Sequence, residues 1–89
     1  MGLEVLKGSQ KTIGTKQTLK AVSKDLVDKV FIAQDADRRI VMPLMELCQQ
    51  KNIAIEEVET MSQLGKACGV DVATASAAIL LSLIHVYLW

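Results

Sequence analysis

The sequence predicts an α/β fold, a three-layer α/β/α sandwich built on a small four-stranded mixed sheet. Short continuous apolar runs, typical of strands covered on both faces, alternate with stretches whose apolar residues recur every three or four positions, as in helices. Turn-forming and capping residues separate these stretches. The chain has 89 residues, 51% of them apolar, and shows no internal repeat or low-complexity linker. Helices that alternate with strands in one such domain are expected to cover both faces of the sheet.

The first half of the chain begins with a weak short helix predicted over residues 2–8 and a very short strand at residues 12–13. The next helix follows a turn at Gly14 and is expected to end near Ser23. The apolar run over residues 30–33 then predicts a strand covered on both faces.

A polar turn follows that strand and contains two acidic residues, Asp35 and Asp37. Asp37 is expected to cap a short turn, after which Pro43 suits the first position of a helix that runs to Lys51 and ends at Asn52. The two carboxylates resemble a metal-binding pair, but no neighbouring residue completes a coordination shell. A strand-end turn with a helix cap is therefore the prediction.

The second half of the chain predicts two further strands and one helix. Residues 53–58 are expected to form a strand, and residues 77–83 the last one. Between them, Thr60 and Gln63 have the spacing of a capping box for a short helix that closes at Gly69.

Charge is balanced overall but not along the chain. Ten basic and ten acidic side chains give a net charge of zero, which argues against unspecific attraction to nucleic acid. Residues 7–29 carry six lysines against two acids, and residues 30–65 carry an excess of acids. A solvated charged face is the usual explanation of lysines alone.

The segment 14–20 is the candidate binding segment. Gly14 allows a tight turn or a close approach by a ligand, and Thr15 suits the N-cap. One polar stripe on the helix is formed by Lys16, Gln17, Lys20 and Lys24. A helix start with orphan N–H groups, two early lysines and an amide suits a phosphate group or a base edge.

The inventory of reactive side chains argues against an enzyme. The sole histidine, His85, lies in an apolar tail, so Cys48 and Cys68 lack an obvious base. Both are expected to be reduced thiols of a cytoplasmic protein, because no secretory segment precedes them. No cofactor or metal site is expected.

Three blocks of the sequence resemble one known family. They are residues 14–20, residues 30–37 and residues 64–69. Together they resemble the large-subunit ribosomal protein seven-Ae and thirty-e family, specifically its small bacterial members. The resemblance implies a three-layer α/β/α fold and binding to kink-turn RNA, whose tandem sheared G·A pairs let the duplex bend sharply.

In that family the first block usually contains Gly-x-Asn-Glu-x-x-Lys, whose Asn, Glu and Lys contact the guanines of the G·A pairs. Here Lys16 stands where Asn is usual and Gln17 where Glu is usual, whereas Lys20 matches. Lysine can donate to guanine O6 and N7, and the Gln17 amide oxygen can still accept a hydrogen bond.

The resemblance implies a second contact in the loop before the last helix, where apolar side chains of relatives pack on a flipped-out nucleotide. Met61 offers an adaptable apolar surface, although without the resemblance core filling is the favoured role of this residue. Lys66 is placed to approach phosphate or to remain a solvated surface lysine. The RNA-binding residues implied are therefore Gly14, Thr15, Lys16, Gln17, Lys20, Val58, Glu59, Thr60, Met61 and Lys66.

The tail departs from the family pattern. Residues 1–83 are assigned to one domain, and residues 84–89 to an apolar extension, which ends an uncharged run of eighteen residues from Val72 to Trp89. A membrane span is not expected, because polar residues interrupt the run and no basic residue follows it. The extension packs on its own domain, packs on a second copy, or results from cloning.

These observations predict a cytoplasmic, non-catalytic protein that binds structured RNA containing a kink-turn, in ribosomal RNA or a riboswitch, and neither DNA nor a membrane. It would select and stabilise the bent RNA conformation. The alternative is a protein-interaction or self-association module that uses the apolar tail.

Overall fold

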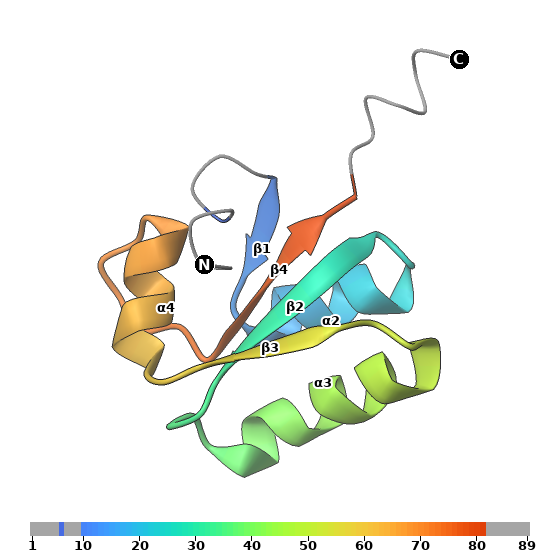
Figure 1. Ribbon diagram of the computed structural model, residues 1–89, viewed down its shortest axis with the longest axis horizontal. Helices are drawn as coiled ribbons and strands as arrows, with labels where there is room; N and C mark the ends of the chain where they lie inside the picture. Colours follow the sequence, from blue (N-terminus) through green and yellow to red (C-terminus); the bar gives the residue numbers. More distant parts are fainter. Residues whose placement is uncertain (1–5, 7–9, 82–89) are drawn as a thin grey trace.

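The computed structural model of the chain describes residue 6 and residues 10–81. Four strands form one sheet (Figure 1): β1 (Lys11–Ile13), β2 (Val27–Ala33), β3 (Ile55–Val58) and β4 (Ser76–Leu80). The helices in the described residues 10–81 are α2 (Thr15–Ser23), α3 (Arg38–Lys51) and α4 (Met61–Cys68).

The sheet is mixed, with the strand order β1-β4-β2-β3. β4 lies between β1 and β2 and is antiparallel to both, whereas β2 and β3 are parallel. The last strand of the described residues, β4, is therefore a central strand, and β1 and β3 form the two edges.

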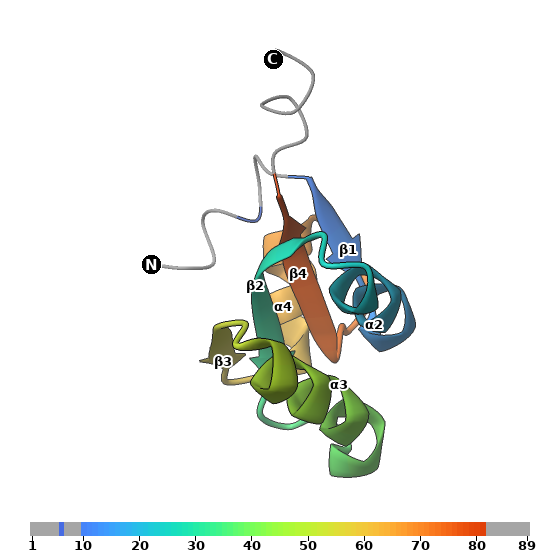
Figure 2. The ribbon, with the colours of Figure 1, turned by 90° about the vertical axis from the view of Figure 1, so that its right-hand side faces the viewer.

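The helices cover both faces of the sheet. α2 and α3 lie against one face and α4 against the other, as the two ribbon views show (Figures 1 and 2). The three-layer α/β/α sandwich with a four-stranded mixed sheet that the sequence predicts is thus confirmed. The carboxyl ends of β2 and β3 and the beginning of β4 lie at the same end of the sheet (Figure 1).

The core is made of apolar side chains from every layer. Phe31 of β2, Leu44 of α3 and Leu64 of α4 are fully buried. β4 contributes the small residues Ala77 and Ala78, also fully buried, so the helices on the two faces can pack close to the central strand. Leu6 is helical and buried, and the rest of the helix predicted over residues 2–8 lies outside the described residues.

One prediction about α3 is wrong. The helix is continuous from Arg38 to Lys51, with Pro43 inside it rather than at its first position. Asp37 caps the helix through its side chain, which accepts a hydrogen bond from the Arg39 N–H at 2.9 Å. Proline removes one backbone hydrogen bond from a helix, a loss that this cap and the buried face of α3 offset. Asn52 ends the helix with a left-handed backbone, as predicted.

Strand bounds also differ from those predicted. β2 begins at Val27, before the apolar run 30–33 from which the strand was predicted. Val27 is buried and Asp28 faces solvent, the alternation expected of a strand. β3 begins two residues later than predicted, at Ile55, and β4 spans Ser76–Leu80 rather than residues 77–83.

The tail is not covered by the structure. Residues 82–89, including the apolar extension 84–89, lie outside the described residues. Within the part of the chain that is described, no helix combines the length and the apolar character needed to span a membrane.

Candidate functional site

The start of α2 is built on Gly14. This glycine has φ 97° and ψ 151°, a backbone conformation that residues with a Cβ rarely adopt, and it is the N-cap of the helix. Its N–H donates to the Ser76 carbonyl oxygen at 2.8 Å. The prediction that Thr15 caps the helix is wrong, because Thr15 is the first helical residue and no side chain caps α2.

Hydroxyl groups fix this helix start to the sheet. The Thr15 Oγ1 and Ser76 Oγ atoms lie 2.6 Å apart, and the Thr12 and Thr18 hydroxyls lie 2.8 Å apart. The Thr18 hydroxyl also donates to the Gly14 carbonyl oxygen at 2.8 Å. Thr18 and Ser76 are fully buried. The network joins α2 to β1 and β4, so the helix start has one fixed position on the sheet.

Three polar side chains of the candidate segment face solvent from this fixed start. Lys16, Gln17 and Lys20 are exposed, and none of them has a side-chain hydrogen bond or ion pair within the described ranges. The first N–H groups of a helix have no carbonyl partner inside the helix. The start of α2 therefore presents positive charge and free donors on the same surface.

The start of α4 is organised differently. The Thr60 hydroxyl caps the helix by accepting from the Gln63 N–H at 3.0 Å. The Met61 N–H donates to the Asp35 carboxylate at 2.7 Å, across from the end of β2. Both acidic residues of the polar turn thus accept hydrogen bonds from N–H groups at helix starts, each at a different helix. The sequence predicts a capping role for Asp37 but not for Asp35.

The predicted residues of the second contact are not equally accessible. Val58 ends β3 and is only 4% exposed, so its side chain belongs to the core. Glu59 is exposed, Thr60 is half-buried, and Met61 is half-buried and packs against the core. Core filling therefore accounts for part of the Met61 side chain, and its remainder faces solvent together with Glu59.

Residues 74–76 bring the two helix starts together. The Thr74 N–H donates to the Met61 carbonyl oxygen at 3.0 Å, and Ser76 receives the N–H of Gly14 at 2.8 Å. Between them, the Ala75 carbonyl oxygen accepts from the Ala33 N–H at 2.9 Å. The two segments that the sequence analysis assigned to one site are thus joined through three consecutive residues at one end of the sheet.

Lys66 lies one turn further along α4 and is exposed. It lines a shallow cavity of about 140 Å³ between α4 and the segment 70–73. Gly65 beside it allows this close packing, because a Cβ at that position would lie 2.2 Å from the Val72 carbonyl oxygen.

The surroundings of both cysteine thiols shift their pKa. Burial raises the pKa of the Cys48 and Cys68 thiols, and the positive charge of Lys11 partly offsets this at Cys68. Both thiols are buried and free, as predicted. No group of three or more metal-ligating side chains occurs among residues 6 and 10–81.

The roles of Ser76 and Thr74 and the partner of Asp35 were not predicted from the sequence. Ser76 lies 61 residues from Thr15, and Asp35 lies 26 residues from Met61. No local pattern indicates partners at such separations. The polar residues inside the otherwise apolar stretch 72–81 were the one available signal, since a buried hydroxyl needs a hydrogen-bond partner.

The fold is that of a small α/β/α protein with a mixed sheet. The start of α2, which carries lysines and has no side-chain cap, and the capped start of α4 lie at one end of this sheet. The chain belongs to the Ribosomal protein L7Ae/L30e/S12e/Gadd45 family, whose model matches residues 3–82. The family suggested by the three sequence blocks is thereby confirmed.

Several relatives carry names that state a binding activity. An RNA-binding protein of Caldanaerobacter subterraneus is 45% identical over 69 residues, which cover 78% of this chain and 84% of that protein. An RNA-binding protein of Halalkalibacterium halodurans is 43% identical over 76 residues, covering 85% of this chain and 93% of that protein. Among solved structures, the Giardia lamblia 15.5kD RNA binding protein is 30% identical with a TM-score of 0.82, covering 90% of this chain and 71% of its own.

Proposed function

We propose that this protein binds RNA and recognises a kink-turn through the start of α2 and the loop 58–61. Membership of the family and the names of its relatives support RNA binding. The kink-turn as the particular target rests on the pattern of residues 14–20 and on the geometry of the surface that carries them.

The observation that carries the proposal is the uncapped but immobilised start of α2. Lys16 and Lys20 point to solvent from a helix start that hydrogen bonds to β1 and β4 hold in place. Lysine ammonium groups donate to guanine O6 and N7, which sheared G·A pairs leave accessible. Gln17 is exposed beside them and accepts or donates through its amide. Because the backbone of this helix start is held by hydrogen bonds, binding has to order only the exposed side chains.

The loop before α4 supplies the second part of the proposed contact. Met61 and Glu59 present side-chain surface, whereas buried Val58 and capping Thr60 hold the loop in position. An apolar side chain of this kind suits an unstacked base, the usual target of sequence-specific RNA recognition. Lys66 lies on the same helix and is proposed to approach a phosphate.

The proposed mechanism contains no chemical step and needs no cofactor. The protein binds the bent RNA more tightly than the extended one and so shifts the RNA population toward the bent form. We propose that this takes place in the cytoplasm.

The test is a gel shift with a kink-turn RNA and with the same duplex in which Watson–Crick pairs replace the G·A pairs. The expected result is tight binding to the intact kink-turn and at least about tenfold weaker binding to the altered duplex. Equal affinity for both RNAs would overturn kink-turn recognition while leaving RNA binding in place. No binding to either would contradict both.

Salt dependence provides an independent check. The chain has no net charge, so few phosphates are neutralised, and the log–log slope of affinity against salt is expected near −2 to −4, for about three or four phosphate contacts. Lys16→Asn restores the residue usual in the family and is expected to leave affinity for the kink-turn close to that of the wild type. A steep slope with equal loss for both RNAs would indicate unspecific attraction instead.

A further inference from the structure

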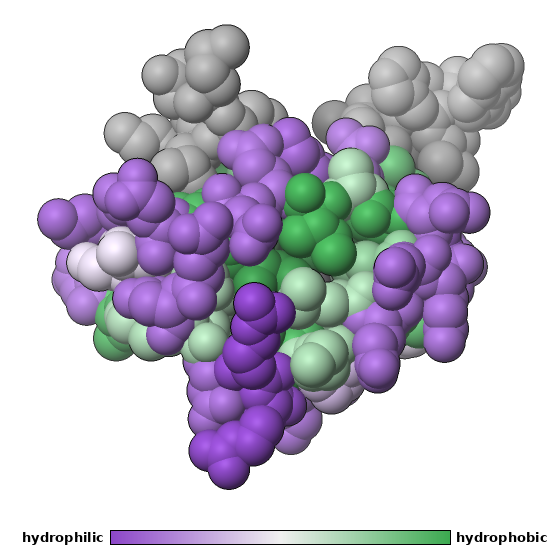
Figure 3. Space-filling model, turned by 60° about the horizontal axis from the view of Figure 1, so that its bottom comes forward, coloured by the Kyte–Doolittle hydropathy of each residue, from purple (hydrophilic) through white to green (hydrophobic). Residues whose placement is uncertain are grey.

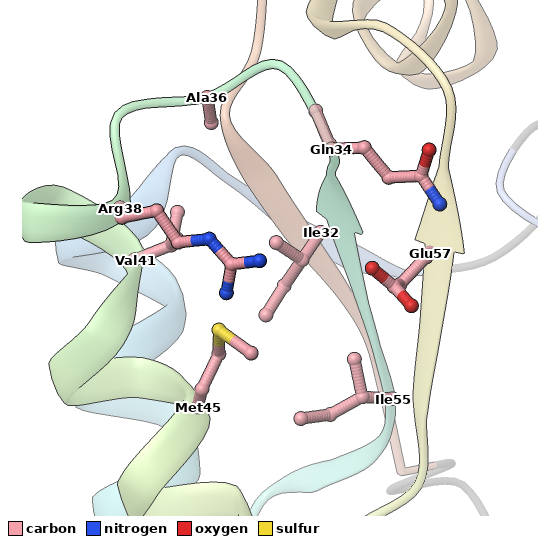
Figure 4. Close-up of a pocket in the computed structure, with 9 residues that line it drawn as sticks. Ile32, Gln34, Ala36, Arg38, Val41, Met45, Ile55 and Glu57 are labelled. Carbon is pink, nitrogen blue, oxygen red and sulfur yellow. The ribbon is translucent and has the colours of Figure 1, made fainter.

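A cavity of about 570 Å³ lies between α3 and the edge strand β3. On the face where α3 comes forward, hydrophobic surface is surrounded by hydrophilic surface (Figure 3). Figure 4 shows side chains from α3, β2 and β3 that line the cavity. A cavity of this size suits a small ligand.

The cavity has an apolar floor and a polar rim. The floor is formed by Ile32, Val41, Met45 and Ile55. The rim is formed by Arg38 at the start of α3, Glu57 on β3, and Gln34 after β2. The Arg38 guanidinium and the Glu57 carboxylate enter from opposite sides and face the space above the floor (Figure 4).

Neither charge on the rim has an ion-pair partner in the described part of the chain, unlike its neighbours in the sequence. Arg39 pairs with Asp37 at 3.1 Å, and Glu56 pairs with Lys29 at 2.6 Å. Arg38 and Glu57 do not form an ion pair with each other, so a cation and an anion border the same apolar surface.

We propose that this cavity binds a small zwitterion with an apolar side chain, such as an aliphatic α-amino acid. The carboxylate of the ligand pairs with the Arg38 guanidinium, whose fork of N–H donors matches a carboxylate. The ammonium group of the ligand pairs with Glu57, and the apolar side chain covers the floor.

The arrangement of charges favours a zwitterion over simpler ligands. A purely apolar ligand would cover the floor but remove water from both rim charges without replacing their interactions. A simple anion or a simple cation would satisfy one charge and meet like charge at the other. Phosphate of RNA would likewise be repelled by Glu57, so the ligand proposed for this cavity differs from the proposed RNA contact.

The experiment is an NMR titration of the full chain without RNA, with L-leucine as the probe. Isocaproate, which lacks the ammonium group, and isoamylamine, which lacks the carboxylate, are the matched ligands. Saturable shifts at the methyl groups of Ile32, Val41, Met45 and Ile55 are expected with leucine. Each matched ligand is expected to bind at least about tenfold more weakly, because one ion pair is lost.

Variants test the two charges separately. Arg38→Gln and Glu57→Gln are each expected to weaken leucine binding by about tenfold or more, whereas Arg39→Gln and Glu46→Gln are expected to change it less than about twofold. All four residues are exposed, so folding is expected to be retained.

Three results would overturn the proposal. They are the absence of saturable shifts up to about 10 mM leucine, equal binding of leucine and isocaproate, and shifts that lie on residues other than those of the cavity. Retention of wild-type affinity in both Arg38→Gln and Glu57→Gln would also contradict it.

Discussion

The starts of α2 and α4 lie at the same end of the sheet and are joined through residues 74–76, yet they treat their backbone donors in opposite ways. At α4, the Thr60 hydroxyl and the Asp35 carboxylate accept hydrogen bonds from N–H groups of the first turn. At α2, Gly14 occupies the N-cap and no side chain caps the helix. The protein itself supplies acceptors for the backbone N–H groups at the start of α4. At the start of α2, these N–H groups remain available to a ligand.

This difference separates stability from binding. Capping groups stabilise a helix, so the start of α4 is expected to contribute to folding. The start of α2 is held instead by its hydroxyl contacts with β1 and β4, which act behind the exposed surface. Changes to exposed side chains of α2 are therefore expected to alter affinity, and changes around α4 to alter the free energy of unfolding.

The largest effect on stability is expected for Gly65→Ala. Its Cβ would lie 2.2 Å from the Val72 carbonyl oxygen, so α4 or the segment 72–74 has to move. We expect the free energy of unfolding to fall by about 3 kcal/mol, measured by urea denaturation. Ser62→Ala on the exposed side of the same helix is the control, with an expected change below about 0.5 kcal/mol. Equal stability of the two variants would show that the close approach is not required.

The largest effect on affinity is expected for Gln17→Ala and Lys20→Ala. Each removes a proposed base contact and should weaken binding to the intact kink-turn by about 1–3 kcal/mol, measured by isothermal titration. Thermal unfolding is expected to stay the same, because both side chains are exposed and unpaired in the described residues.

Lys24→Ala is the matched control for these two variants. Lys24 is the C-cap residue at the far end of α2, so its loss should weaken intact and altered RNAs alike and by a smaller amount. Wild-type affinity in both Gln17→Ala and Lys20→Ala would mean that the start of α2 does not read the RNA.

A smaller effect is expected for Thr60→Ala, which removes the cap of α4. The Gln63 N–H loses its acceptor, and the free energy of unfolding should fall by about 1 kcal/mol in urea denaturation. Thr60→Ser keeps a hydroxyl and should retain most of the stability. If alanine and serine behaved alike, the hydroxyl would not be the stabilising group.

The smallest effect concerns Asp37 at the start of α3. Hydrogen bonds from the Arg39 side chain and N–H hold the pKa of this carboxyl below its ordinary value of 3.8. Because the pKa is lower in the folded state, the contribution to stability is present above the ordinary value and is lost as pH falls through the lowered one. Asp37→Asn should therefore lose less stability than the wild type on acidification.

The measurement for Asp37 is urea denaturation of both proteins at pH values from about 6 to about 2. The gap between wild type and variant is expected to be a small one, since the carboxyl is exposed, and to close toward the acid end. If the difference in stability between wild type and variant widened on acidification, the pKa of Asp37 would not be lowered by folding.

Local signals explain how much of the fold the sequence predicts. Asp37, Asn52, Thr60 and Gly69 act on backbone groups within a few residues, and the structure places each at the helix end expected from its chemistry. Pro43 misled for the same reason: its preference for a first helical turn is local, whereas the buried face of α3 continues back to Val41. Tertiary packing decided that boundary.

Only the solvent-exposed side chains of the candidate site could be predicted from the sequence. Lys16, Gln17 and Lys20 follow from their spacing on one helix and from a family resemblance. The hydrogen bonds behind them join residues from distant strands, such as Thr15 and Ser76, and the burial of Val58 depends on the whole sheet. The order and direction of the strands determine such partners, and the spacing of residues along the chain does not reveal them.

The central position of β4 has a consequence for synthesis of the protein on the ribosome. Until residues 76–80 leave the exit tunnel, β1 and β2 have no strand between them, and Gly14 and Thr15 lack Ser76. The nascent chain therefore cannot complete the start of α2, because closing contacts so far apart comes late. A protein with this strand order gains its helix-start surface only after β4 has been synthesised, and a translation product that stops before β4 would lack it.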